Sequence, residues 1–202
     1  MTLLVLASGS PRRRDLLAAS GFAFDVRPAD VDESPLPGEG AEELVHRLAV
    51  AKAEAGLAAA PERPVVVLAA DTLVSVDGEV LGKPLDPADA ARMLRLLSGS
   101  RHQVLTGVAV ATSTATAATL SVEVETTHVH MAAWTEDQIA AYVASGEPMD
   151  KAGSYAIQEV GDRFVTRIEG SFDNVVGLPV ERTRRMLAEA GIARPEGQPP
   201  EV

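Results

Sequence analysis

Residues 3–17 read LLVLASGSPRRRDLL and join a short apolar run to a turn of small residues and the start of a helix. The apolar run, Leu3 to Leu6, predicts a strand. Ser8 to Ser10 predict a tight turn, Ser10 suits the N-cap of the following helix, and Pro11 suits its first position. A strand, a tight loop and a helix N-terminus in this order direct backbone N–H groups towards an anion.

Three arginines, Arg12 to Arg14, follow Pro11 directly. Cations at a helix N-terminus oppose the macrodipole by roughly 0.3–1 kcal/mol each when exposed, so folding alone favours Asp or Glu there. We therefore expect a bound anion to offset these charges, and a phosphate chain is the leading candidate. A solvated basic helix end is the other interpretation, and this stretch alone leaves both open.

The bulk composition narrows the class of protein. The chain has 202 residues, 46% hydrophobic and 23% charged, a balance ordinary for a globular protein with a sizeable core. It has no cysteine, which excludes disulfides and thiol catalysis and fits a cytoplasmic protein. The net charge of -11 argues against broad binding to nucleic acid or acidic membranes, so any polyanion site must be local. We also expect no membrane span and no secretory signal.

Two further stretches carry charged side chains whose role the pattern leaves open. Asp30, Asp32 and Glu33 form an acidic loop that either lies in solvent or binds a divalent cation, since hard cations take carboxylate oxygens. Residues 42–59 predict a helix with an apolar stripe, and Lys52 lies on or beside that stripe. Its ammonium either reaches back to water or points into a cleft.

The run from Val65 to Ala70 predicts a strand covered on both faces, which ends at Asp71 and Thr72. Polar residues at the carboxyl end of a buried strand are where open α/β sheets bind ligands. Asp77-Gly78 predicts a two-residue hairpin turn, and in its simplest register Thr72 faces Lys83 with Asp71 one residue beyond. These side chains either form part of a site at one end of the sheet or make an ordinary surface ion pair.

The rest of the chain alternates predicted helices and strands, which is the pattern of an α/β fold. Capping and periodicity predict helices at residues 86–97, 135–146 and 179–190 and strands at residues 104–110, 120–131 and 164–168. Residues 111–119, rich in Ala and Thr, predict a connection, and residues 170–178 a loop bounded by glycines. No linker separates autonomous domains, so we expect one domain over residues 1–193 and a disordered tail over 194–202.

Five blocks of sequence together resemble the Maf family of nucleoside triphosphate pyrophosphatases. They are LASGSPRRRDLL (6–17), AADTLVSVDGEVLGKP (69–84), SGSRHQVLTGVAV (98–110), GEPMDKAGSYAIQ (146–158) and GSFDNVVGLP (170–179). The blocks span nearly the whole chain in the family's order, and it is their combination that is specific. The resemblance implies a fold similar to inosine triphosphate pyrophosphatases: an α/β protein with an elongated mixed sheet, helices on both sides, and two lobes around a central cleft.

The resemblance also implies an activity, the hydrolysis of a nucleoside triphosphate to the monophosphate and pyrophosphate, assisted by a divalent cation such as Mg²⁺ or Mn²⁺. Gln158, after the DKAG-Y-I pattern, looks like the branch of the family that prefers dTTP and UTP. The oligomeric state stays open, with a homodimer among the options.

Carried over by position, the resemblance implies a role for nine residues. Asp71 would be the general base that activates water, and Glu33 would assist the metal or the water, so that these two carboxylates would hold the cation. The residues that would hold the triphosphate, with the two lysines also serving catalysis, are Ser8, Arg13, Lys52 and Lys83. The residues in positions that the family uses for base selection are Arg12, Thr72 and Gln158.

The chemistry of these residue types agrees with such roles. Water that attacks the α-phosphorus must give up a proton, and the negative charge that grows there must be offset. A carboxylate beside phosphates repels them unless lysines, arginines and a divalent ion intervene. Mg²⁺ needs few protein ligands, because it shares the phosphates of the substrate.

Other functions are compatible with parts of the pattern. A nucleotidyl transferase would need a second substrate, and an aspartyl-phosphate phosphatase would have a second Asp where Leu73 stands. A non-catalytic nucleotide-binding regulator of cell division would bind triphosphate without turnover. A pyrophosphatase selective for a modified purine nucleotide would differ only in its base, which Gln158 does not fix because its amide both donates and accepts hydrogen bonds.

Overall fold

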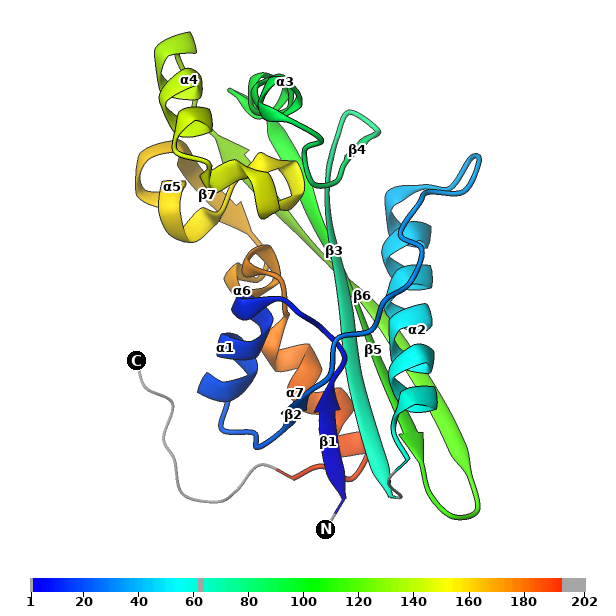
Figure 1. Cartoon of the computed structure of the whole chain (residues 1–202). Coiled ribbons are helices and arrows are strands. Elements are labelled where there is room, and N and C mark those ends of the chain that lie inside the picture. Colours follow the sequence, from blue (N-terminus) through cyan, green and yellow to red (C-terminus); the bar gives the residue numbers. More distant parts are fainter. Residues whose placement is uncertain (1, 62–63, 194–202) are drawn as a thin grey trace. The chain divides into compact units, whose positions relative to one another are not determined.

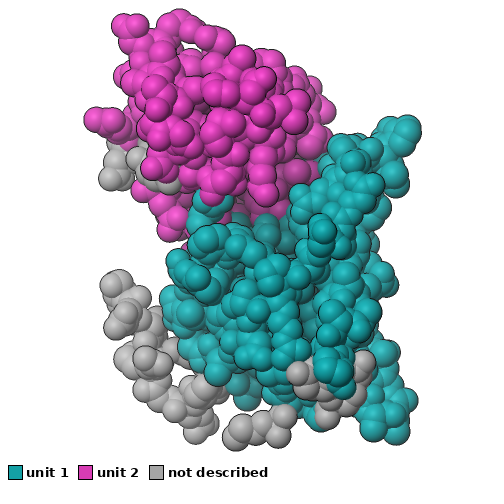
Figure 2. Space-filling view, viewed as in Figure 1, with its two compact units in different colours: residues 1–71, 106–125, 177–202 teal, residues 72–105, 126–176 magenta. Residues whose placement is uncertain are grey.

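The computed structural model describes residues 2–61 and 64–193, so the tail predicted at residues 194–202 lies outside the described residues. The chain divides into two compact units (Figure 2). Unit 1 comprises Met1–Asp71, Thr106–Glu125 and Gly177–Val202, and unit 2 comprises Thr72–Leu105 and Thr126–Val176. The single domain expected over residues 1–193 stays a prediction.

Helices and strands are interspersed along the chain, as the sequence predicts (Figure 1). The strands are β1 (Leu3–Leu6), β2 (Asp25–Val26), β3 (Val65–Val76), β4 (Glu79–Leu81), β5 (Arg101–Ser113), β6 (Ala118–Met131) and β7 (Val165–Glu169). The helices are α1 (Pro11–Ala19), α2 (Ala41–Ala59), α3 (Pro87–Leu97), α4 (Glu136–Ala144), α5 (Ile157–Phe164), α6 (Phe172–Val176) and α7 (Val180–Glu189). Two 3₁₀ turns, η1 (Glu147–Asp150) and η2 (Ala152–Ser154), lie between α4 and α5.

The strands of the described residues form one seven-stranded mixed sheet, in the order β2-β1-β3-β5-β6-β7, with β4 paired to β3. β1 lies parallel to both β2 and β3, whereas β4 on β3 and β7 on β6 are antiparallel. Three strands, β3, β5 and β6, supply residues to both units. The α/β fold with a mixed sheet that the sequence predicts is therefore confirmed.

In unit 1 the sheet carries a core on each face (Figure 1). The even-numbered residues of β1 and β3 pack with Leu17 of α1 and Met186 of α7. Their odd-numbered residues pack with Ala49 and Ala53 of α2. Successive side chains of a strand point to opposite faces, so burial on both sides explains why these two strands read as continuous apolar runs.

Two helix starts confirm the capping predicted from the sequence. Ser10 Oγ accepts a hydrogen bond from the N–H of Arg13 at the start of α1, and Pro11 takes the first helical position. Thr135 caps α4, and its own N–H donates to Gln138 Oε1 at 2.8 Å. The helix α1 therefore begins directly after the small-residue turn, with three arginines in its first turns.

The strand that begins at Val65 does not end at Asp71 and Thr72, so that prediction is wrong. β3 runs on to Val76, and Asp71 is buried within it. The sheet tolerates the carboxylate because the ammonium of Lys52 contacts it at 2.6 Å. A buried charge with an opposite partner does not interrupt a strand, and the apolar pattern resumes after it.

The hairpin that follows has the predicted register, with Val74 opposite Leu81. Its turn residues Asp77 and Gly78 have φ values of 49° and 83°, which suit a type I′ turn. β4 ends at Leu81, however, so Lys83 lies in an exposed bend two residues beyond that strand. The pairing of β3 with β4 therefore stops before it would place Thr72 opposite Lys83.

Two predicted connections contain more regular structure than expected. β5 continues to Ser113 and β6 begins at Ala118, so only residues 114–117 of the Ala/Thr-rich stretch form the turn. That turn is closed by a hydrogen bond of 2.8 Å from Thr114 N to Ala117 O. The predicted loop at residues 170–178 contains the short helix α6. In both cases regular backbone hydrogen bonding extends into residues that the sequence assigned to a connection.

Unit 2 buries a histidine against a tyrosine. His102 on β5 is 1% exposed, and its Nε2 lies 2.7 Å from Tyr155 Oη, with the two rings edge to face. Burial, with a smaller contribution from His130, lowers the pKa of His102 to about 4. The ring is therefore neutral at physiological pH.

Mild acid should weaken the fold through His102. The unfolded chain regains a histidine pKa of about 6.5, so between about pH 6.5 and 4 it binds more protons than the folded chain. The stabilisation is complete above that unfolded pKa and falls as the pH drops, by about 2 kcal/mol at about pH 4.5. Urea unfolding at neutral pH and at about pH 4.5 measures this difference.

Two glutamine substitutions separate His102 from the carboxylates that also titrate in acid. His46 on α2 is exposed, so His46→Gln should retain the full acid sensitivity of the wild type. His102→Gln should lose most of it, because an amide does not titrate. Equal acid sensitivity in the two variants would contradict the prediction.

Candidate active site

Unit 1 holds a lysine between two carboxylates. Lys52 Nζ lies 2.6 Å from Asp71 Oδ1 and 2.5 Å from Glu33 Oε1. The Lys52 and Asp71 side chains are only 10% and 9% exposed, whereas Glu33 is about half exposed. The ammonium therefore does not reach back to water; it pairs with the carboxylate on β3. That it points into a cleft stays a prediction.

The helix α2 brings Lys52 to Asp71 because it approaches the sheet closely. A Cβ added at Gly56, one turn beyond Lys52, would lie 2.9 Å from Ala7 Cβ and 2.9 Å from Val67 Cγ1. Contacts this short require glycine. Lys52 lies on the same buried side of α2 as Ala53, so its side chain is directed along the face of β3.

The acidic loop is held on α2 by Arg47. Its guanidinium binds Glu39 through two hydrogen bonds of 2.6 and 2.7 Å and donates to the carbonyl of Ser34 at 3.0 Å. The hydrogen bond with Arg47 lowers the pKa of Glu39 to about 2. These contacts fix the loop directly after Glu33, which explains how an exposed carboxylate is kept at Lys52.

The turn after β1 positions Arg13 beside this group. Arg13 Nη1 donates to Ser8 Oγ at 3.1 Å, and its Nε donates to the carbonyl of Gly177 at 2.9 Å. Burial lowers the pKa of Arg13, and the charges of Asp71 and Glu33 act against that shift. The guanidinium is thus held within the electrostatic reach of the two carboxylates.

Ser8 is buried and its hydroxyl oxygen already accepts two hydrogen bonds. The second comes from the N–H of Ser10 at 3.3 Å. A hydroxyl that accepts twice still has its own hydrogen to donate. Ser8, the N–H groups at the start of α1 and Arg13 together can therefore bind an oxyanion.

The other two arginines of the cluster have different surroundings. Arg12 is partly exposed, and Arg14 is exposed and pairs with Asp15 at 3.0 Å. The structure directs Arg13 into the group around Ser8. A surface pair such as that of Arg14 contributes little to stability.

Unit 2 contains the remaining predicted residues, Thr72, Lys83 and Gln158. Thr72 is partly buried in β3, Lys83 is exposed, and Gln158 is exposed near the start of α5. Gly153 links their segments: its N–H donates to Gly82 O at 3.0 Å, and a Cβ added to it would lie 2.8 Å from Val74 Cγ2. The turn before α5 is thereby fixed against β3 and against the bend that carries Lys83.

The positioning contacts of Gly177 and Gly153 could not be predicted from the sequence. Both have positive φ, 126° at Gly177 and 67° at Gly153. The blocks GSFDNVVGLP and GEPMDKAGSYAIQ contain them, but a glycine in a motif does not reveal which group its backbone contacts.

Glu33 and Asp71 fit a hard divalent cation in one respect. Both supply carboxylate oxygens, and Mg²⁺ uses one or two carboxylates when it also binds substrate phosphates and water. Within residues 2–61 and 64–193, no group of three or more His, Asp or Glu side chains could hold an ion. That Glu33 and Asp71 hold a cation stays a prediction.

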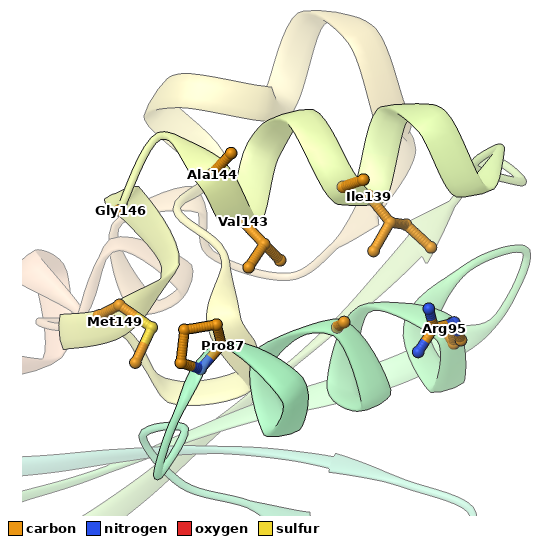
Figure 3. Close-up of a pocket in the computed structure, with 9 residues that line it drawn as sticks. Pro87, Arg95, Ile139, Val143, Ala144, Gly146 and Met149 are labelled. Carbon is orange, nitrogen blue, oxygen red and sulfur yellow. The ribbon is translucent and has the colours of Figure 1, made fainter.

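An apolar pocket of about 490 Å³ lies in unit 2 between α3, α4 and η1 (Figure 3). Pro87, Ile139, Val143 and Met149 line it, and Arg95 lies at one end, where it pairs with Glu136 at 2.7 Å. None of the nine predicted site residues lines this pocket.

Among the described residues, no helix is long and apolar enough to span a membrane.

Comparison with known proteins places these residues in a family context. The family model described as Maf-like protein matches residues 3–190. A dTTP/UTP pyrophosphatase of Anaeromyxobacter dehalogenans (strain 2CP-C) is 53% identical, over 97% of this chain and 98% of its own. Proteins with the same name from Methylobacillus flagellatus and Vibrio vulnificus (strain YJ016) are 48% and 51% identical, over 98% and 94% of this chain and 98% and 99% of their own.

Substituting Gly153 should destabilise unit 2 by about 2–4 kcal/mol, because Gly153→Ala combines backbone strain at positive φ with a clash against Val74. Gly146→Ala provides the matched control: its φ is 79°, and nothing lies within 4 Å of an added Cβ. Urea unfolding should show a loss of only about 1 kcal/mol there. Similar losses in both variants would contradict a packing role for Gly153.

Proposed function

Because the chain belongs to the Maf-like protein family, we propose that it is an enzyme that hydrolyses dTTP and UTP to the monophosphate and pyrophosphate. Relatives at about half identity over nearly the full chain carry that activity in their names. The structural observation that supports it is the buried Asp71–Lys52 pair beside Arg13. Cytoplasmic location, a homodimer and a cleft between two lobes stay predictions.

In the proposed reaction Asp71 accepts the proton of the water that attacks the α-phosphorus. A carboxylate is a competent general base when it lies within hydrogen-bond reach of that water. Asp71 and Glu33 would by themselves repel a triphosphate, and Lys52 offsets part of their charge at 2.5–2.6 Å. The ammonium remains in place as negative charge grows on the phosphate oxygens, which is electrostatic stabilisation by a preorganised group.

The residues assigned to the triphosphate are Ser8, Arg13, Lys52 and Lys83. In unit 1, Ser8 offers a hydroxyl hydrogen and Arg13 a guanidinium fixed by Gly177. In unit 2, Lys83 is exposed and free of the β4 ladder, so its flexible side chain can follow a phosphate. Arginine and lysine suit these tasks differently, because the guanidinium is a rigid fork and the ammonium a mobile point charge.

Glu33 and Asp71 would hold the divalent cation, Mg²⁺ or Mn²⁺. When bound, such an ion neutralises phosphate charge and polarises the phosphoryl oxygens. Lys52 already contacts both carboxylates, so the protein can keep them together before any ion arrives.

Base selection is assigned to Arg12, Thr72 and Gln158. Gln158 is exposed at the start of α5, and its amide can match the adjacent donor and acceptor of a uracil or thymine edge. A pyrophosphatase for a modified purine nucleotide and a non-catalytic regulator of cell division are the alternative functions. A panel of triphosphates with Mg²⁺ and Mn²⁺, with pyrophosphate and monophosphate measured together, separates the three.

In that panel we expect equal amounts of pyrophosphate and monophosphate and the fastest turnover on dTTP and UTP. Fastest turnover on a modified purine nucleotide would favour the first alternative. Tight binding without turnover would favour the second. Formation of orthophosphate instead of pyrophosphate would contradict both pyrophosphatase proposals.

Asp71→Asn should lower kcat by about 10²–10⁴, the typical contribution of a general base, while nucleotide binding largely survives. The measurement is steady-state turnover of dTTP together with nucleotide affinity by calorimetry. Asp77→Asn makes the same chemical change in the hairpin turn, where Asn also tolerates positive φ, and should leave kcat unchanged. Wild-type kinetics in Asp71→Asn would rule out Asp71 as the base.

The arginines should separate phosphate binding from base selection. Arg13→Ala should weaken the binding of every triphosphate alike, by roughly tenfold or more, because it removes charge-assisted hydrogen bonds to phosphate. Arg12→Ala should instead change the ratio of kcat/KM between bases. Arg14→Ala, which removes an exposed guanidinium paired with Asp15, is the matched control and should change neither. The same uniform loss in Arg12→Ala and Arg13→Ala would contradict this division.

A further inference from the structure

The buried contact between His102 and Tyr155 lies close in sequence to the proposed base-selecting residue. Tyr155 precedes Gln158 by three positions, and both belong to the block GEPMDKAGSYAIQ. Tyr155 is 6% exposed and His102 is 1% exposed, so neither is placed to read a base itself. Their hydroxyl and imidazole meet at 2.7 Å.

This hydrogen bond is hard to replace once broken. Among the described residues, His102 Nδ1 is a buried atom with no hydrogen-bond partner, so the contact at Nε2 is the ring's only one there. Loss of the Tyr155 hydroxyl would leave the second ring nitrogen unpaired as well. A buried polar group without a partner is costly, so the pair selects one position for the Tyr155 ring.

A short, buried stretch of backbone connects Tyr155 to Gln158. Tyr155 is extended, with φ −147° and ψ 155°, and the next two residues, Ala156 and Ile157, are 8% and 5% exposed. Gln158 follows as the first exposed side chain. On the other side, Ser154 has φ 62° and its hydroxyl donates to Met93 Sδ at 3.1 Å.

Lys151 fixes the beginning of the same segment. The residue is 5% exposed, and its ammonium donates to Glu147 O at 2.5 Å and to Asp150 Oδ1 at 2.9 Å. Residues 147–157 thus have anchors at Lys151, Gly153 and Tyr155 before the chain reaches Gln158. Tyr155 is the last of these anchors with a side-chain hydrogen bond before Gln158.

We propose that the hydrogen bond between His102 and Tyr155 positions Gln158, so that both are specificity-determining positioning residues for the pyrimidine base. The inference rests on the proposed function, because Gln158 reads a base only if the chain hydrolyses nucleotides. Discrimination by hydrogen bonds requires donors and acceptors to be held within a fraction of an ångström, and an exposed glutamine is placed only by its backbone. His102 and Tyr155 supply that placement from the interior of unit 2.

The test compares Tyr155→Phe with Tyr142→Phe, because these are the chain's two tyrosines and each variant loses one hydroxyl. Tyr142 lies on α4, where its ring packs against Trp134 with centroids 5.7 Å apart. The readout is the ratio of kcat/KM for dTTP to that for dCTP, whose bases differ at the edge that Gln158 would contact. Inhibition by inorganic tripolyphosphate reports the phosphate subsite separately.

Tyr155→Phe should reduce the ratio of kcat/KM for dTTP to that for dCTP about tenfold, by slowing the hydrolysis of dTTP rather than that of dCTP. Its inhibition by tripolyphosphate should stay within about twofold of the wild type, since Ser8 and Arg13 are untouched. Tyr142→Phe should keep the ratio. His102→Gln should retain more of the ratio than His102→Phe, because an amide can still pair with the hydroxyl.

An unchanged ratio in Tyr155→Phe, or equal losses on dTTP, dCTP and tripolyphosphate, would overturn the positioning role. Should Tyr155→Phe fail to fold, the comparison of His102→Gln with His102→Phe tests the same positioning role. The proposed function fails separately, if the wild type itself does not hydrolyse dTTP. A wild type that prefers dTTP together with an unchanged dTTP/dCTP ratio in Tyr155→Phe would overturn only the inference.

Discussion

The ammonium of Lys52, held between the carboxylates of Asp71 and Glu33, is the contact on which the candidate site depends. Charges that leave water are tolerated only when an opposite charge compensates them. Lys52 allows Asp71 to lie inside a central strand that would otherwise exclude a carboxylate. The guanidinium of Arg13, on which the charges of Asp71 and Glu33 both act, adds a second cation to this group.

The fold provides this contact through close packing rather than through a flexible loop. Gly56 lets α2 approach β1 and β3, and Arg47 holds the acidic loop on α2. Arg13 is fixed in the same way, by a backbone carbonyl at Gly177 and by Ser8. Side chains held by rigid elements lose little entropy when a ligand arrives, which is what a site for a multiply charged substrate needs.

Much of the fold could be predicted from local sequence, and part of the site could not. Apolar runs, the Ser10 cap and the Asp77-Gly78 turn are local signals, and the structure confirms each of them. The prediction that the strand ends at Asp71 is wrong, because the strand continues only with the help of Lys52, which lies in another element. The contacts of Gly177, Gly153 and His102 were missed for the same reason: each joins segments far apart in the chain, and the residue type alone does not identify the partner.

The central claim is that this site directs water to the α-phosphorus of a nucleoside triphosphate. Hydrolysis of dTTP in ¹⁸O-labelled water, with both products analysed by mass spectrometry, tests it most directly. Attack at the α-phosphorus predicts one labelled oxygen in the monophosphate and none in the pyrophosphate. Label in the pyrophosphate, or release of labelled orthophosphate, would contradict it.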